Sequence, residues 1–152
     1  MCEFFAHGVP APQGSKNLVR LRSGRTIMVE ASKRVMPWRA VIAASAVAAR
    51  VRMYEEDVEV KIVARWARPA SHFTASGSFR KSAPVLPRYA DCDKLARAVC
   101  DALAGIAYRN DRQVGKLSVE RRWCVDGEPQ GAVVSVFEIP KRITIKEQKC
   151  AT

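Results

Sequence analysis

Four aspartates fall close together in a chain that is otherwise strongly basic. The 152 residues include 26 Lys and Arg against 15 Asp and Glu, a formal net charge of +11, which favours a polyanionic partner such as nucleic acid. The stretch 91–111 nevertheless contains Asp91, Asp93, Asp101 and Asp111. Carboxylates repel phosphates unless a cation lies between them, and Mg²⁺ is typically held by one or two carboxylates with water and substrate phosphate. The cluster therefore points to metal-assisted hydrolysis of a phosphodiester.

The same aspartates also fit roles without chemistry. Asp93 can cap a helix, Asp101 can pair with Arg97 one helical turn away, and Asp111 can shape a turn. The D-x-D spacing of Asp91 and Asp93 does not decide between these roles and a metal site. A non-catalytic DNA- or RNA-binding protein is therefore the main alternative to a nuclease, although a pure binder has no reason to gather acids.

Around the aspartates the sequence predicts a small single-domain α/β (α+β) fold, with a mixed β-sheet and about two main helices. One helix is expected from Pro37 to about Val51, and clean alternation predicts a half-buried strand at Val58–Trp66. Further strands are expected at Cys2–Gly8, Asn17–Leu21, Thr26–Val29, Val114–Val125 and Ala132–Ile139, with turns at Ser23-Gly24 and Asp126-Gly127. We expect one domain over 1–140 and a basic C-terminal tail over 141–152.

A second helix is expected to carry the aspartates, starting at Asp91 or Asp93 and ending at Gly105. Its apolar face comprises Leu95, Ala98, Val99, Ala102 and Leu103, and its polar face comprises Asp93, Lys94, Arg97 and Asp101. A helix of about 12 residues is about 18 Å long, so the chain must fold back for Asp111 to approach Asp91. A strand that begins at 111–114 beside the start of the helix would allow this approach.

The stretch 67–90 has no clear periodicity and predicts a long loop, which in compact domains is usually functional or disordered. It contains four basic residues and no acidic residue. Basic residues expected to contact DNA phosphates are Lys16, Arg68, Arg80, Lys81 and Arg88. Phe73, Phe79 and Tyr89 lie among them, and an aromatic ring there can stack on an unpaired base. A solvated flexible loop is the alternative, and Trp66 and Trp123 are expected in the core or an interface.

Several classes of protein are excluded by composition. The longest uncharged apolar run is about Val41–Ala49, far below the ~20 residues of a membrane span. The N-terminus lacks the basic region and cleavage site of a signal peptide. Five cysteines form neither a CxxC pair nor a Cys/His zinc spacing, so we expect reduced thiols in a cytoplasmic protein.

The stretch Asp91–Leu103, followed by Ala107–Val114, resembles the RusA family of Holliday junction resolvases. The family pattern is roughly P-D-x-D-N-L-x-K-x-x-x-D-A-L, a short loop, then D-D-x-Q-V. The opening Gly8–Lys16 is similar to the family's Pro-rich start, and the later segments follow in the family's order. The resemblance covers nearly the whole chain, and its most specific part is Asp91–Val114.

The resemblance implies a homodimeric, Mg²⁺-dependent endonuclease, with Mn²⁺ as a substitute. Its expected substrate is branched DNA, above all four-way junctions, in recombination, repair or phage DNA processing in a bacterial or phage-infected cytoplasm. By position, Asp91, Asp93 and Asp111 would be the catalytic metal-binding carboxylates. The family's essential Lys falls at Arg97, with Lys94 as an assisting cation. Asp101 and Gln113 match recurring residues expected to support the site.

Four departures from the family pattern affect this expectation. Ala90 stands in place of the usual Pro, Lys94 in place of a common Asn, and Asn110 in place of the first Asp of the D-D pair. Arg97 keeps the charge of the family's Lys, but its guanidinium is a planar fork that does not readily lose a proton. A degenerate resolvase that binds junctions without cutting them is therefore the alternative within the family.

Overall fold

The chain forms a small α+β domain, as the sequence predicts. The computed structural model describes residues 1–14, 16–30 and 33–140, so the expected basic tail, 141–152, lies outside the described residues. The elements in chain order are β1 (Cys2–His7), β2 (Lys16–Arg20), β3 (Thr26–Glu30), α1 (Val35–Ala48), β4 (Val58–Trp66), η1 (Ala70–His72), α2 (Cys92–Leu103), η2 (Asp111–Gln113), β5 (Val114–Trp123) and β6 (Gly131–Glu138). Each predicted helix and strand is present, with ends that differ by up to three residues.

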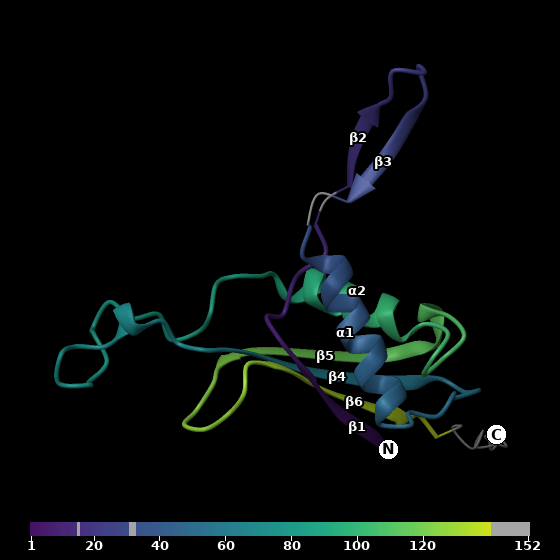
Figure 1. Ribbon diagram of the computed structural model, residues 1–152. Coiled ribbons are helices and arrows are strands. Elements are labelled where there is room, and N and C mark those ends of the chain that lie inside the picture. Colours follow the sequence, from purple (N-terminus) through teal and green to yellow (C-terminus); the bar gives the residue numbers. More distant parts are fainter. Residues whose placement is uncertain (15, 31–32, 141–152) are drawn as a thin grey trace, which may run out of the picture.

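The main sheet is mixed and has the strand order β1-β6-β4-β5. β4 runs parallel to β5 and antiparallel to β6, and β1 pairs antiparallel with β6. A parallel pair needs a crossover, and here the crossover consists of the long loop 67–90 and helix α2. Both helices cover the same face of the sheet, so the domain has two layers (Figure 1).

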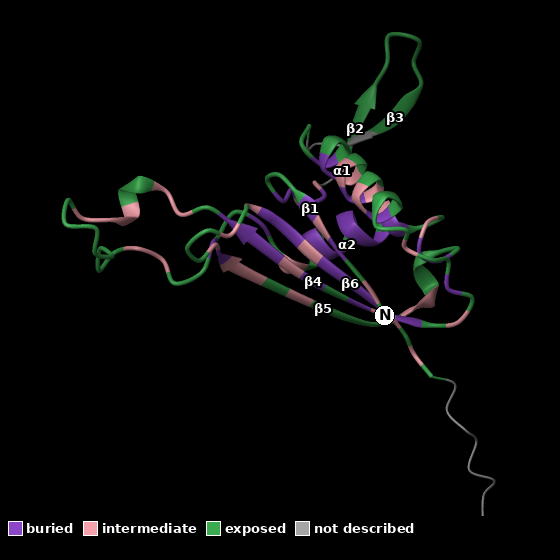
Figure 2. Cartoon of the chain, turned by 60° about the horizontal axis from the view of Figure 1, so that its bottom comes forward, coloured by how far each residue is buried: buried purple, intermediate pink, exposed green. Residues whose placement is uncertain are grey.

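The core lies between the helices and that covered face. On β4, Val58, Val60 and Ile62 are buried towards the helices, as their alternation predicts, and Trp66 at the strand's end is also buried. Arg65, expected on the opposite, exposed face, is buried as well, because Phe5 covers its guanidinium and Glu128 accepts a hydrogen bond from it. Figure 2 shows the burial concentrated along β4, β6 and the inner sides of α1 and α2.

Helix α1 differs in its ends from the sequence prediction. It begins at Val35, so Pro37 lies within the first turn, where a missing N–H costs nothing. It ends at Ala48, and Ala49, which lies within the predicted helix, is exposed. Trp38 and Ile42 are buried, and the helix packs on β1 and α2.

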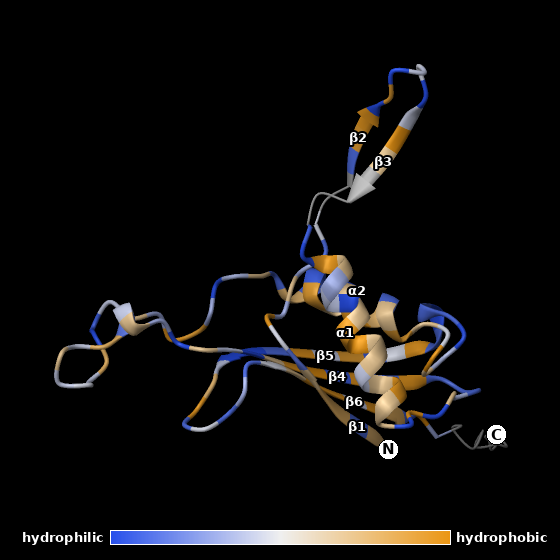
Figure 3. Cartoon of the chain, in the orientation of Figure 1, coloured by the Kyte–Doolittle hydropathy of each residue, from blue (hydrophilic) through white to orange (hydrophobic). Residues whose placement is uncertain are grey.

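The β2–β3 hairpin forms a separate two-stranded sheet that projects from the body of the domain (Figure 1). Leu18 and Met28 face each other across the pair and are exposed. Apolar residues lie next to each other in the middle of each strand, and polar residues lie at the strand ends (Figure 3). The predicted hairpin is therefore confirmed, but none of its described side chains belongs to the core.

The structure bears on two of the expectations from composition, which concern a membrane span and the cysteines. Within the described residues, no helix is long and apolar enough to cross a membrane. Cys2, Cys92, Cys100 and Cys124 are free thiols.

Candidate active site

Helix α2 carries its charges on one side because its apolar residues recur at helical spacing. Leu95, Ala98, Val99 and Leu103 are buried, whereas Asp93, Lys94, Arg97 and Asp101 are exposed, as the sequence predicts. Asp91 occupies the N-cap position, but its side chain makes no capping hydrogen bond. Its carboxylate instead pairs with Lys94 Nζ at 3.1 Å.

The segment after α2 is tied down by its own polar groups. Gly105 adopts φ +83°, which lets the chain turn immediately after the helix. The buried Tyr108 hydroxyl donates a hydrogen bond to the carbonyl of Cys100 at 2.9 Å. Gln113 accepts from the N–H of Arg109 and donates to the carbonyls of Tyr54 and Glu56. Gln113 thereby anchors η2, the turn that carries Asp111.

These constraints create a hollow between α2 and the start of β5, which we call the acid hollow. Its volume is about 330 Å³. From α2 it is lined by Asp93, Ala96, Arg97, Cys100 and Asp101, and from η2 and β5 by Asp111, Val114 and Leu117. Asp93, Arg97 and Asp101 follow one another at four-residue spacing, which puts them on one helix face. The structure thus brings three of the four clustered aspartates to one surface.

The carboxylates differ in their partners. Asp101 forms an ion pair with Arg39 of α1, and not with Arg97 as the sequence suggested. Asp91 pairs with Lys94. For Asp93 and Asp111, the described residues supply no hydrogen-bond or ion-pair partner to the carboxylate. These two carboxylates, and the guanidinium of Arg97, are therefore free to act on a ligand.

The structure does not place Asp91 beside Asp111. Arg121, near the end of β5, donates to the carbonyl of Ala90 at 2.5 Å, whereas Val114 at the start of β5 lies beside the far end of α2. Helix and strand therefore run in opposite directions, because the short connection 104–110 starts the strand where the helix ends. Asp91 does not line the acid hollow, and no three His, Cys, Asp or Glu side chains in the described ranges are grouped closely enough to hold a metal ion.

The apolar wall of the acid hollow stays uncharged at neutral pH. Burial raises the pKa of the Cys100 thiol, and the nearby charges of Asp101 and Asp111 act in the same direction. Burial also raises the pKa of the Tyr108 hydroxyl, which does not itself line the hollow, well above its usual value. Among the residues that line the hollow, the charged ones are thus the three aspartates and Arg97.

The predicted DNA-contacting residues have different environments. Lys16 lies in β2, but its side chain is outside the described part of the structure. Arg68 and Arg80 are used inside the loop: Arg68 donates to the carbonyl of Pro84 at 3.2 Å, and Arg80 Nε donates to that of Phe73 at 2.9 Å. Lys81 and Arg88 are exposed and have no ion-pair partner among the described residues.

A comparison with protein-family models supports the assignment suggested by these residues. The model described as endodeoxyribonuclease RusA matches residues 7–136, which include the β2–β3 hairpin, the long loop 67–90, helix α2 and the acid hollow. A comparison with curated proteins gives no match. Because the family model covers most of the chain, this chain belongs to the RusA endodeoxyribonuclease family.

Proposed function

We propose that this chain is a divalent-cation-dependent endonuclease that resolves four-way DNA junctions, as a homodimer in the cytoplasm, during recombination, repair or phage DNA processing. The observation that carries the proposal is the pair of unpartnered carboxylates, Asp93 and Asp111, at one hollow in a chain with a net charge of +11. Free carboxylates at this position weaken DNA binding unless a cation is bound between them and a phosphate. Family membership supports hydrolysis of DNA.

The acid hollow fits a divalent cation by its donor chemistry. Mg²⁺ takes hard oxygen ligands, keeps several waters and needs only one or two protein carboxylates. Asp93 and Asp111 would hold Mg²⁺ or Mn²⁺, and Asp91, which does not line the hollow, would have to leave Lys94 and move towards them to join. That exposed ion pair contributes at most about 1 kcal/mol, so its loss is a small cost. When bound, such a cation supplies a water of lowered pKa and a positive charge for the phosphate.

Arg97 is the residue suited to bind the scissile phosphate. It lines the same hollow, and Asp101, four residues later on the same helix face, is already paired with Arg39. The guanidinium charge therefore stays uncompensated, and its planar fork can donate two parallel hydrogen bonds to phosphate oxygens. Lys94, on the same face and one turn nearer the start of α2, can contact a neighbouring phosphate. Asp101 would keep its link to α1 rather than bind the cation.

Symmetric resolution needs two cuts, and each needs its own set of carboxylates. Among the described residues one chain offers a single acid hollow with unpartnered carboxylates. A homodimer would supply the second. The oligomeric state can be measured by light scattering on the purified chain, and we expect the mass of a dimer.

The test is cleavage of a labelled synthetic four-way junction with Mg²⁺, with Mn²⁺ and with EDTA. We expect paired symmetric nicks that need the cation and disappear in Asp93→Asn and in Asp111→Asn, which each remove a carboxylate of the acid hollow. Glu120→Gln is the matched control, because Glu120 is an exposed carboxylate on β5 that does not line the acid hollow. This variant should cut as the unmodified protein does.

Three other results would contradict the proposal. Tight junction binding without cleavage would identify the chain as a degenerate resolvase. If Arg97→Lys then recovered cleavage, the loss of activity would be due to Arg97 in place of the family's Lys. Equal cutting of linear duplex and junction would indicate a general nuclease. Cleavage that persists in EDTA would exclude the role given to the carboxylates.

A further inference from the structure

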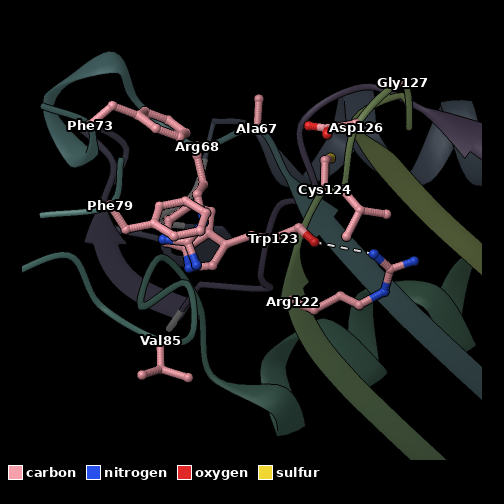
Figure 4. Close-up of a pocket in the computed structure, with 11 residues that line it drawn as sticks. Ala67, Arg68, Phe73, Phe79, Val85, Arg122, Trp123, Cys124, Asp126 and Gly127 are labelled. Atoms are coloured by element: carbon pink, nitrogen blue, oxygen red, sulfur yellow. Dashed lines mark hydrogen bonds between the residues drawn. The ribbon is translucent and has the colours of Figure 1, made fainter. Parts of the chain in front are cut away.

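A second hollow, larger than the acid hollow, lies at the other end of β5. Its volume is about 680 Å³, and we call it the loop hollow (Figure 4). Its walls are the long loop and the turn between β5 and β6. The lining residues used below are Arg68, Phe73, Phe79, Val85, Trp123 and Asp126. Tyr89, two residues before Asp91, packs on Trp123 with ring centroids 5.8 Å apart, so this hollow adjoins the start of α2.

Four flat side chains stack along one wall of the loop hollow. The guanidinium of Arg68 lies over the ring of Trp123 at 4.9 Å and over the ring of Phe79 at 4.6 Å. The rings of Phe79 and Phe73 are 5.2 Å apart and tilted by 35°. Figure 4 shows Phe73 and Phe79 reaching from the loop towards Arg68 and Trp123. We call Trp123, Arg68, Phe79 and Phe73 the loop stack.

The loop stack is held in place by backbone and carbonyl groups. Phe73 and Phe79 form an isolated antiparallel bridge, and the N–H of Arg80 donates to the carbonyl of His72 at 2.9 Å. The carbonyl of Pro84 accepts from both Trp123 Nε1, at 3.0 Å, and Arg68. A stack fixed in this way loses little conformational entropy when a ligand packs on it.

In an ordinary hydrophobic core all of these rings would be buried, but part of the loop stack is exposed to solvent. Trp123 is buried, whereas Phe79 is 63% exposed and Val85, across the hollow, is 84% exposed. Exposed apolar groups that gather around one hollow are typical of a binding site. The free surface of Phe79 is therefore suited to a flat, apolar ligand group.

The charges around the loop hollow identify the class of that ligand. The loop 67–90 has no acidic residue, and Lys81 and Arg88 are exposed cations with no ion-pair partner in the described chain. Asp126 is the one acid among the residues that line the hollow. A flat surface on a loop that also carries free cations complements a nucleotide, whose base stacks while its phosphate contacts the cations.

We propose that the loop hollow receives an unpaired base of branched DNA, stacked on Phe79. This inference rests on the proposed action on DNA junctions. Bases inside a duplex are paired and stacked on each other, whereas a base at a branch point leaves the stack at lower cost. Because every base has a flat face, such a site selects DNA by its structure and not by its sequence.

The test compares junction, single-stranded and duplex DNA in EDTA, so that no strand is cut. The probes are a four-way junction with 2-aminopurine at the branch, a single-stranded oligonucleotide and a linear duplex with the junction's arm sequence. The variants are Phe79→Ala, Phe79→Tyr as the rescue, and Leu86→Ala as the matched control, since Leu86 is an exposed apolar residue of the same loop that does not line the hollow. Phe79 is mostly exposed, and a thermal melt confirms that each variant folds.

We expect Phe79→Ala to bind the junction and the single strand about 5- to 150-fold more weakly, with duplex affinity unchanged within about twofold. Phe79→Tyr and Leu86→Ala should bind as the unmodified protein does. The change in 2-aminopurine emission on binding should disappear in Phe79→Ala. Unchanged single-strand affinity in Phe79→Ala, or an equal loss on duplex, would overturn the inference.

Failure of the proposed function gives a different result. If the unmodified protein does not cut junctions with Mg²⁺, the binding series in EDTA still tests the loop hollow. If it does cut them, Phe79→Ala at saturating protein should keep the cleavage rate, because Phe79 does not line the acid hollow. Loss of cleavage at saturation would assign Phe79 to the chemical step and contradict a role in binding alone.

Discussion

The two hollows lie towards opposite ends of β5 and use charge in opposite ways. The acid hollow leaves the carboxylates of Asp93 and Asp111 without a partner in a basic protein. The loop hollow lies beside the most basic loop, yet Arg68 is occupied by two rings and a carbonyl. If only the sign and the density of charge were considered, every cation of the loop would be assigned to DNA binding. The partners of each group show instead that the free charges are Asp93, Asp111 and Arg97 at the acid hollow, and Lys81 and Arg88 on the loop.

The largest expected effect separates the free carboxylates from the paired one. Asp93→Asn and Asp111→Asn should each lower junction cleavage by about 1000-fold or more, because each would remove a cation ligand. Junction affinity should stay the same or rise, because one negative charge near the phosphates is lost. Asp101→Asn should keep most of the activity, since Asp101 is paired with Arg39. Single-turnover cleavage and binding in EDTA measure the two quantities separately.

The order of these three variants tests the distinction between free and paired carboxylates. A loss in Asp101→Asn as large as in Asp93→Asn would contradict it and would assign Asp101 to the cation. Near-normal cleavage in both Asp93→Asn and Asp111→Asn would remove the acid hollow from the reaction altogether.

A smaller effect is expected from the cation of the acid hollow. Arg97→Ala should slow cleavage by about 100- to 1000-fold, the usual cost of losing one donor to a developing charge. Arg97→Lys restores the residue typical of the family and should cut at least as fast as the unmodified protein. The matched control is Lys81→Ala, which removes a free cation of the loop. It should weaken binding and its dependence on salt, but leave the cleavage rate at saturation unchanged.

The loop stack should contribute to stability as well as to binding. Arg68→Met keeps an apolar side chain but removes the two cation–π contacts, each about 0.5–1 kcal/mol, so the free energy of unfolding should fall by about 1–2 kcal/mol. Arg88→Met removes an exposed cation that makes no such contacts, so the free energy of unfolding should change little. Urea denaturation measures both variants. Equal stability of the two would mean that the Arg68 contacts do not hold the loop.

Local sequence patterns predicted most of the fold but not the partners of the charged groups. The alternation of Val58–Trp66 fixed that strand to the residue, because side chains of a strand alternate between two faces. Asp101 pairs with Arg39, 62 residues earlier, and Arg68 stacks on Trp123, 55 residues later. No local pattern encodes such contacts, since they depend on how α1, α2 and the loop pack in three dimensions.

One error about the site could have been avoided from the sequence. A fold-back that brings Asp111 to Asp91 needs a connection as long as the helix, about 18 Å. The connection 104–110 contains a turn at Gly105 and a buried Tyr108, so little of its length is available to run back along α2. Its shortness therefore predicts that β5 starts at the end of α2, which is what the structure shows.

The smallest expected effect concerns the turn that forms the far wall of the loop hollow. Glu128 accepts hydrogen bonds from Arg122 at 2.5 and 2.7 Å, from the N–H of Val125 and from Arg65, which together lower its pKa to about 2. A carboxyl whose pKa is lowered by folding stabilises the folded state above its unfolded pKa, near 4.5, and this contribution is lost as the pH falls towards 2.

Glu128→Gln should therefore lower the melting temperature by a few degrees at pH 7 and by progressively less below pH 4.5, with Glu120→Gln as the control. Junction cleavage should not change, because Glu128 does not line the acid hollow. A difference in melting temperature that stays constant down to pH 2 would show that Glu128 acts through its shape and not through its charge.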